Sequence, residues 1–197
     1  AEICEVLKSH PAYFHVDAAQ GFGKEMTVLR NKRIDLISIS GHKIFAPKGV
    51  GALITRRRNF KRAPLKPIMF GGGQEFGLRS GTLPVPLVAG LGHAAHLSQV
   101  EHAKRREYCT SLGNIIVKLF QEHGFTLIGD QNRRTPGIVC MAHKRFDSES
   151  IILALRDNLA FSNGAACSSA TYTTSHVLQA LGIEPDLQQG AIRLSWS

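Results

Sequence analysis

The residues best suited to chemistry lie in one short segment, Ser40-Gly41-His42-Lys43, which follows the apolar run from Leu36 to Ile39. Such a run predicts a buried strand, and small residues directly after it allow the backbone to approach a bound group closely. A lysine in a partly dry pocket is less stable as the ammonium ion, and its free amine can form a Schiff base with a carbonyl compound. The other interpretation of Lys43 is a surface lysine that caps a loop.

An acidic residue, Asp17, ends a second strand-like run at residues 13–17, and Gln20 follows just beyond it. Pyridoxal 5'-phosphate (PLP) enzymes require a lysine that binds the aldehyde and an acid that keeps the pyridine nitrogen protonated, so that the ring accepts electrons. A further run at residues 51–55 completes an α/β pattern, in which ligands gather at the carboxyl ends of strands. Asp17 and Lys43 both fall at such ends.

A resemblance to a known family rests on five segments, which in chain order are HVDAAQ, SISGHKIFAPKGVGAL, FGGGQEFGLRSGTLPVPLVAGLG, SNGAACSSA and AIRLSWS. Together they resemble the cysteine desulfurases that serve iron-sulfur assembly. The members that supply sulfur for DNA phosphorothioation are most similar, at PLKPIMFGGGQE and LAFSNGAACSSATYTTSHVL. The resemblance implies the α/β fold of the fold-type-I PLP-dependent transferases. Because family members are much longer, it also implies that this chain is a fragment that lacks the N-terminal half.

The resemblance assigns the cofactor to residues at the two strand ends. It implies that Lys43 binds PLP covalently and later moves the Cα proton of the substrate, L-cysteine. Asp17 would pair with the pyridinium nitrogen, and Gln20 would donate a hydrogen bond to the ring hydroxyl. Ser40 and His42 would hold the phosphate. No metal is expected.

A glycine-rich loop at residues 70–75 precedes the segment from Arg79 to Thr82. Glycine backbone and nearby hydroxyl groups form a natural cradle for an anion, although a flexible turn has the same composition. The resemblance implies a homodimer in which Thr82 reaches the cofactor phosphate of the other subunit. The family pattern usually has an arginine where this chain has Phe76, which leaves the charge of the loop surface open.

A small, polar run at residues 162–170 predicts a mobile loop with Cys167 near its tip. A cysteine on an exposed loop can be a reactive thiolate, although an incidental loop cysteine fits the composition as well. The resemblance implies that Cys167 attacks the substrate sulfur, leaving alanine and a persulfide that passes to an acceptor protein. The four cysteines show no C-x-x-C spacing, which argues against a zinc ribbon or a small disulfide scaffold. Cys4, Cys109 and Cys140 lie in helical or strand-like contexts and are interpreted as structural.

The last run, residues 191–196, alternates in polarity and predicts a strand at a domain edge, with Arg193 opposite its apolar neighbours. A surface arginine is one interpretation. The resemblance implies a bidentate clamp on the α-carboxylate of the substrate, for which the guanidinium geometry is suited.

Between these motifs, residues 86–124 predict one long or two consecutive helices, and residues 148–158 predict a helix with Ser148 as its N-cap. His93 and His96 share one helix face, but no third metal ligand lies nearby, so surface or packing roles are favoured. We expect a partial PLP-binding domain at residues 1–100 and a smaller α+β domain at residues 101–197.

The formal net charge is +9, and residues 1–100 carry 14 of the 24 basic and 6 of the 15 acidic side chains. A dense basic run at residues 56–62 attracts acidic protein surfaces or nucleic acid. A solvated loop, or a surface neutralised by sequence absent here, explains it equally well, and direct contact with nucleic acid is the least favoured interpretation. With no signal peptide and no apolar run near 18 residues, we expect a cytoplasmic protein without membrane contact.

Two other functions fit part of this pattern. A different fold-type-I enzyme, such as an aminotransferase or a selenocysteine lyase, would share Asp17 and Lys43 but would not need Cys167. A non-catalytic half-chain could act as an interaction surface through its basic run, and such a chain would bind no PLP by itself.

Overall fold

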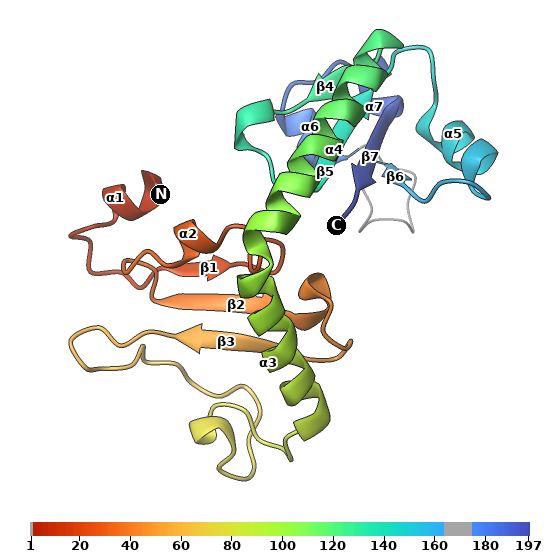
Figure 1. Ribbon diagram of the computed structural model, residues 1–197. Coiled ribbons are helices and arrows are strands. Elements are labelled where there is room, and N and C mark those ends of the chain that lie inside the picture. Colours follow the sequence, from red (N-terminus) through yellow and green to blue (C-terminus); the bar gives the residue numbers. More distant parts are fainter. Residues whose placement is uncertain (1, 164–174) are drawn as a thin grey trace. The chain divides into compact units, whose positions relative to one another are not determined.

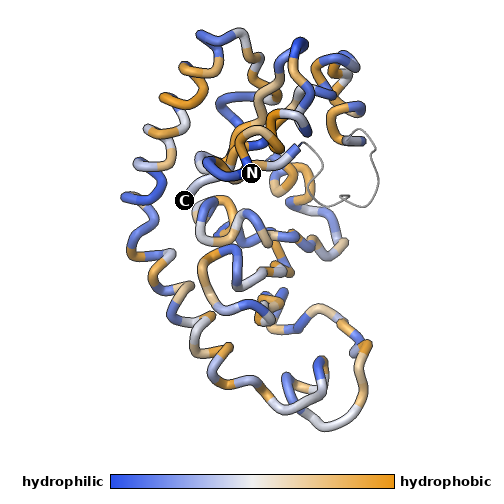
Figure 2. Tube along the Cα trace, turned by 90° about the vertical axis from the view of Figure 1, so that its right-hand side faces the viewer, coloured by the Kyte–Doolittle hydropathy of each residue, from blue (hydrophilic) through white to orange (hydrophobic). Residues whose placement is uncertain are grey.

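The computed structural model describes residues 2–163 and 175–197. The chain divides into two compact units, residues 1–102 and residues 103–197. Hydrophobic and hydrophilic positions alternate along the helices (Figure 2), and none of the helices in the described ranges is long and apolar enough to cross a membrane.

The first unit contains a three-stranded sheet with the order β1-β2-β3 (Figure 1). Strands β1 and β2 are parallel, whereas β2 and β3 are antiparallel. The elements of this unit are α1 (Glu2–Val6), β1 (His15–Asp17), α2 (Met26–Leu29), β2 (Leu36–Ser40), the 3-10 helix η1 (Gly41–Ile44), β3 (Gly51–Thr55), the 3-10 helix η2 (Glu75–Gly77) and α3 (Val85–Val100). The predicted α/β pattern and its strand runs are therefore confirmed.

Helix α3 packs against the turn that carries the candidate lysine. Leu91 and Ala94 of α3 form one buried cluster with Ile44 and Ala46, which follow β2. The approach is close, because a Cβ atom added at Gly90 would lie 2.9 Å from the Cδ atom of Pro47. Only glycine fits this position without moving the proline ring, and the turn after β2 is thereby held against the helix.

A buried carboxylate, Asp35, ties the segment before β1 to β2. It accepts hydrogen bonds from the backbone N–H of Phe14 at 2.7 Å, from Arg33 at 2.8 Å, and from Arg58 at 2.6 and 3.1 Å. Burial alone would raise the pKa of Asp35, but the Phe14 N–H and the two guanidinium groups outweigh it and hold that pKa below its usual value. The network fixes the register of the two strands whose ends carry the candidate site.

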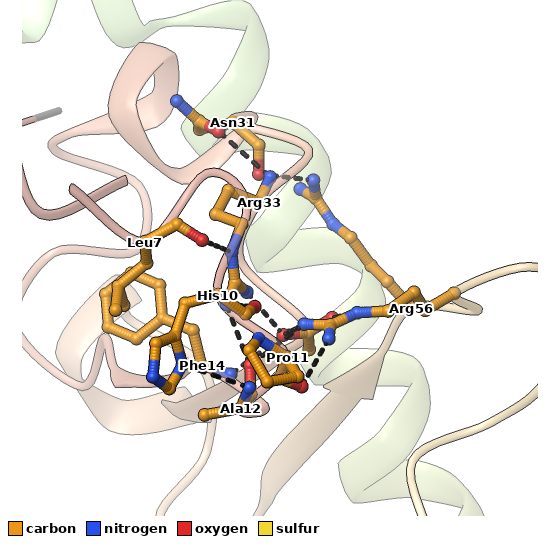
Figure 3. A network of polar contacts seen from close by, with 10 residues as sticks. Leu7, His10, Pro11, Ala12, Phe14, Asn31, Arg33 and Arg56 are labelled. Carbon is orange, nitrogen blue, oxygen red and sulfur yellow. Dashed lines mark hydrogen bonds and ion pairs between the residues drawn. The ribbon is translucent and has the colours of Figure 1, made fainter. Parts of the chain in front are cut away.

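Arg33 and Arg56 donate to backbone carbonyl groups of the surrounding loops. Figure 3 shows Arg33 beside Leu7, whose carbonyl oxygen accepts from Nε at 2.6 Å, and Arg33 also reaches the carbonyls of His10 and Ala12. Arg56 donates to the carbonyl of Asn31 at 2.6 Å. These contacts hold the segments that follow α1 and α2 close to the sheet.

The second unit has a four-stranded antiparallel sheet with the order β4-β5-β7-β6. Its elements are α4 (His102–Glu122), β4 (Thr126–Ile128), the 3-10 helix η3 (Gln131–Arg133), β5 (Ile138–Ala142), α5 (Ser148–Leu155), β6 (Ser162–Asn163), α6 (His176–Ala180), α7 (Pro185–Gln189) and β7 (Ala191–Ser195). Two consecutive helices, α3 and α4, occupy the region where one long or two helices were predicted. Val117 of α4 packs with Val139, Met141, Ile192 and Leu194 on one face of the sheet.

The strand predicted at residues 191–196 is confirmed as β7, which is an interior strand of the sheet because it pairs with β5 on one side and with β6 on the other. One local prediction in this unit was wrong. The N-cap of α5 is Asp147 and not Ser148, since the Asp147 carboxylate accepts from the backbone N–H of Ser150 at 2.9 Å. That bond lowers the pKa of Asp147, whereas Ser148 is buried inside the first turn.

Candidate functional site

Parallel pairing brings the carboxyl ends of β1 and β2 to the same edge of the first sheet. Asp17 is paired with Ser38, and the N–H of the buried residue Ala18 donates to the Ser38 carbonyl at 2.9 Å. Two residues further on, Ser40 ends β2. The acid and the turn that contains Lys43 therefore leave neighbouring strands on the same side, as ligand sites in α/β sheets do.

The turn after β2 leaves no room for a side chain at its first residue. A Cβ atom at Gly41 would lie 2.8 Å from the carbonyl oxygen of Val50, to which the Gly41 N–H donates a hydrogen bond at 2.9 Å. One turn of 3-10 helix follows and ends at Phe45, whose φ is 67°. Lys43 lies within this turn, is half-buried, and forms no hydrogen bond or ion pair within the described part of the chain. No described residue therefore occupies its amine.

The acidic residue at the end of β1 is fixed by its own backbone. One carboxylate oxygen of Asp17, Oδ1, accepts from the N–H of Ala19 at 2.9 Å, which leaves Oδ2 for another donor. Gln20 follows in an exposed turn, and no hydrogen bond of its side chain is found among the described residues. A carboxylate that keeps one oxygen free can hold a proton on a ring nitrogen.

Ser40 and His42 form a polar pair beside the lysine. The distance from Ser40 Oγ to His42 Nδ1 is 3.0 Å, and His42 is exposed. A hydroxyl and an imidazole at this separation can both donate to one phosphate group.

Side chains close the glycine-rich loop on itself. Ser80 is buried and donates to the carbonyl of Gly72 at 3.0 Å, while the amide oxygen of Gln74 accepts from the N–H of Gly81 at 3.2 Å. Thr82 leaves this closed loop as an exposed residue, and no hydrogen bond or ion pair joins it to the strand ends within the described ranges.

Phe76, in the same loop, is 79% exposed and adopts the left-handed region at φ 58°. The Arg62 guanidinium lies 4.0 Å from the centre of its ring, which is a favourable cation–π distance. The loop therefore keeps a positive charge at this surface, although it comes from Arg62 and not from residue 76.

The basic run is less available to partners than its composition indicates. Arg56 donates to backbone carbonyls, and Arg58 is bound to Asp35 and lies over the ring of Tyr13 at 4.9 Å. Arg57, in contrast, is exposed. Part of the run is therefore structural, which the local pattern did not reveal.

In the second unit, Arg193 lies in the middle of β7, opposite its apolar neighbours as predicted. Ile192 and Leu194 are buried in the core, whereas Arg193 is half-buried and forms no hydrogen bond or ion pair with any described residue. Its cross-strand partner on β5 is Cys140. The sequence alone did not place Cys140 in the site. The alternation of residues 138–142 is the pattern that could have indicated that Cys140 lies on the same face of the sheet as Arg193. Cys167 lies outside the described residues.

The chain is similar to a known family of proteins. A family model described as aminotransferase class-V matches residues 1–196. Over 194 residues the chain is 43% identical to the cysteine desulfurase IscS of Ehrlichia chaffeensis and 45% identical to the mitochondrial cysteine desulfurase of Saccharomyces cerevisiae. It covers 98% of its own length in both cases, but only 47% and 38% of those relatives. The crystal structure of DndA from Streptomyces lividans matches with a TM-score of 0.83 and 42% identity, over 100% of this chain and 56% of that one. The chain thus spans less than half the length of these two curated relatives.

Proposed function

Because this chain belongs to the class-V aminotransferase family, we propose that the protein it forms part of is a PLP-dependent cysteine desulfurase that converts L-cysteine to L-alanine. One observation carries the proposal: Asp17 ends a strand parallel to β2, and an uncommitted lysine, Lys43, lies in the turn directly after β2. The identity of 43 to 45% with proteins named cysteine desulfurase supports the choice of reaction.

The residues at the strand ends fit PLP by their chemistry. Lys43 supplies an amine with no competing partner among the described residues, and Asp17 has one carboxylate oxygen to spare. Ser40 and His42 offer two donors to a phosphate. When bound, PLP supplies an electron sink for charge that develops at the substrate Cα.

In the proposed mechanism these residues hold the cofactor, and Lys43 also acts as a base. Lys43 would hold the cofactor through its amine and would act as the base toward the Cα proton of the substrate. Asp17 keeps a proton on the ring nitrogen, because its negative charge favours the protonated form. Ser40, His42 and, from a second subunit, Thr82 hold the phosphate and so orient the ring.

Residues of the second half of the chain bind the substrate and cleave its carbon–sulfur bond. Arg193 binds the α-carboxylate through two parallel hydrogen bonds. The thiolate of Cys167 attacks the substrate sulfur, the carbon–sulfur bond breaks, and the sulfur remains on Cys167 as a persulfide. L-cysteine and one thiol thus give L-alanine and one persulfide, with no external oxidant or reductant.

Two kinds of partner complete the proposal. A second copy of the protein contributes Thr82 to each cofactor site, which makes the enzyme a homodimer. An acceptor protein, belonging to iron-sulfur assembly or to DNA phosphorothioation, takes the sulfur from Cys167. Both follow from the sequence resemblance, and the matches to IscS and DndA support the transfer of sulfur to an acceptor protein.

The test is turnover of L-cysteine by the intact holoenzyme, followed as alanine formed and as sulfide released in the presence of a thiol reductant. We expect Cys167→Ser to abolish both products, while Cys109→Ala, at a buried cysteine, keeps them. If Cys167→Ser turned over L-cysteine at the full rate, the protein would be a different fold-type-I enzyme.

A further inference from the structure

A row of four side chains crosses the second sheet on the face opposite α4. Pairing in register places Ile128 beside Cys140, Cys140 beside Arg193, and Arg193 beside Ser162. Residues directly opposite each other in antiparallel strands have Cβ atoms about 4.5–5.5 Å apart and interact through their side chains. Arg193 therefore has two short, uncharged neighbours, a thiol on one side and a hydroxyl on the other.

Arg193 lies at the boundary between the buried and the exposed part of this face. Two residues before it, Ala191 is fully buried together with Ala142 and Leu178. Two residues after it, Ser195 is exposed. The stem of Arg193 thus starts at the edge of a packed cluster, and its guanidinium group can reach solvent or a ligand, as long basic side chains commonly do.

Cys140 packs against that same cluster and remains uncharged. Burial raises the pKa of the Cys140 thiol, and the positive charge of Arg193 offsets this only in part. A neutral thiol is a weak hydrogen-bonding partner, so it does not compete for the five donors of a guanidinium group. The lack of any hydrogen bond or ion pair to Arg193 within the described residues agrees with this.

We propose that Cys140 is a positioning residue for Arg193: it fills the space beside the arginine with a small uncharged group and so leaves the guanidinium donors for a bound carboxylate. The proposal rests on the proposed function, in which that carboxylate belongs to L-cysteine. An acidic residue at position 140 would instead pair with Arg193 and compete with the substrate.

The experiment compares Cys140→Asp with Cys140→Asn in the intact holoenzyme, since the two side chains have the same size and differ in charge. We expect Cys140→Asp to raise the KM for L-cysteine about tenfold or more, because a charge-assisted pair must be broken before substrate binds. Cys140→Asn should change KM less than about threefold, and kcat should stay within about threefold in both variants, because the chemical step is untouched. Equal KM changes in the two variants, or a fall in kcat alone, would overturn the proposal.

A second readout does not depend on turnover. In side-chain NMR, the Nε–H of Arg193 should exchange faster with water in the wild type and in Cys140→Asn than in Cys140→Asp, where the new carboxylate protects it. Unchanged exchange in Cys140→Asp would overturn the proposal. If the wild type turned over no L-cysteine but exchange slowed in Cys140→Asp, the proposed function would fail while the relation between Cys140 and Arg193 would stand. Thermal unfolding of each variant, with Cys140→Ser as the mildest change, checks that the fold is retained.

Discussion

Replacing Asp35 by asparagine should destabilise the unit that carries the candidate lysine. The Asp35 side chain is 6% exposed and binds Arg33, at 11% exposure, and Arg58, at 32%. Removing one partner of a buried pair typically costs about 3–5 kcal/mol. Because Arg58 is partly solvated and asparagine keeps one acceptor oxygen, we expect Asp35→Asn to lower the free energy of unfolding by about 2–4 kcal/mol.

The measurement is urea unfolding at neutral pH, followed by far-UV circular dichroism, with hydrogen exchange to locate the change. Exchange of the β1 and β2 amides should accelerate roughly 30- to 700-fold, which corresponds to the same free energy. Glu5→Gln is the matched control, because Glu5 is 71% exposed and its ion pair with Lys8 is 3.8 Å long. That variant should lose less than about 1 kcal/mol.

The pH dependence of the stability loss in Asp35→Asn is an independent test of the role of the Asp35 carboxylate. The pKa of Asp35 is lower in the folded than in the unfolded protein. Its contribution to the free energy of unfolding is therefore fully present above the pKa of the unfolded state, and it is lost as the pH falls through the pKa of the folded state. The difference between wild type and Asp35→Asn should therefore begin to shrink below about pH 4. A loss under about 1 kcal/mol at neutral pH, or a difference that persists in acid, would refute the reasoning.

Two further predictions concern the packing and the chemistry of the first unit. Gly90→Ala should lower the free energy of unfolding by about 1–2 kcal/mol, because its Cβ atom would meet Pro47. Gly92→Ala, in the same helix with nothing within 4 Å, should instead raise it by up to about 1 kcal/mol, and equal effects would contradict the packing argument. Asp17→Asn should keep PLP bound, as judged by absorbance, while kcat for L-cysteine falls roughly 100-fold or more, because the ring nitrogen loses its proton. An unchanged kcat would remove Asp17 from the proposed mechanism.

The sequence predicted best what local pattern controls. The apolar run before Ser40 and the acid at the end of the preceding strand predicted two strands with functional groups at their carboxyl ends, and both strands are present. The pattern of Arg193 between apolar neighbours also predicted its orientation, because alternation along a strand is a local property.

Two features that the sequence missed depend on contacts between distant segments, and a third is local. Strand order is not encoded in the alternation of residues 191–196, so the interior position of β7 could not be read from it. Arg58 bonds to Asp35, 23 positions away, and a run of arginines gives no sign of such a partner. At the start of α5, Asp147 and Ser148 are adjacent and both suit an N-cap, and only the observed hydrogen bond distinguishes them.

The most direct test of the central claim is to trap the cofactor on the protein. The purified protein is incubated with PLP, reduced with borohydride and digested, and the labelled peptide is identified by mass spectrometry. We expect the label on Lys43. The control variant is Lys48→Ala, at an exposed lysine close to the same turn, and it should keep the label, whereas Lys43→Ala should lose it. A label on another lysine, or no label in the wild type, would contradict the assignment of Lys43 as the residue that binds PLP.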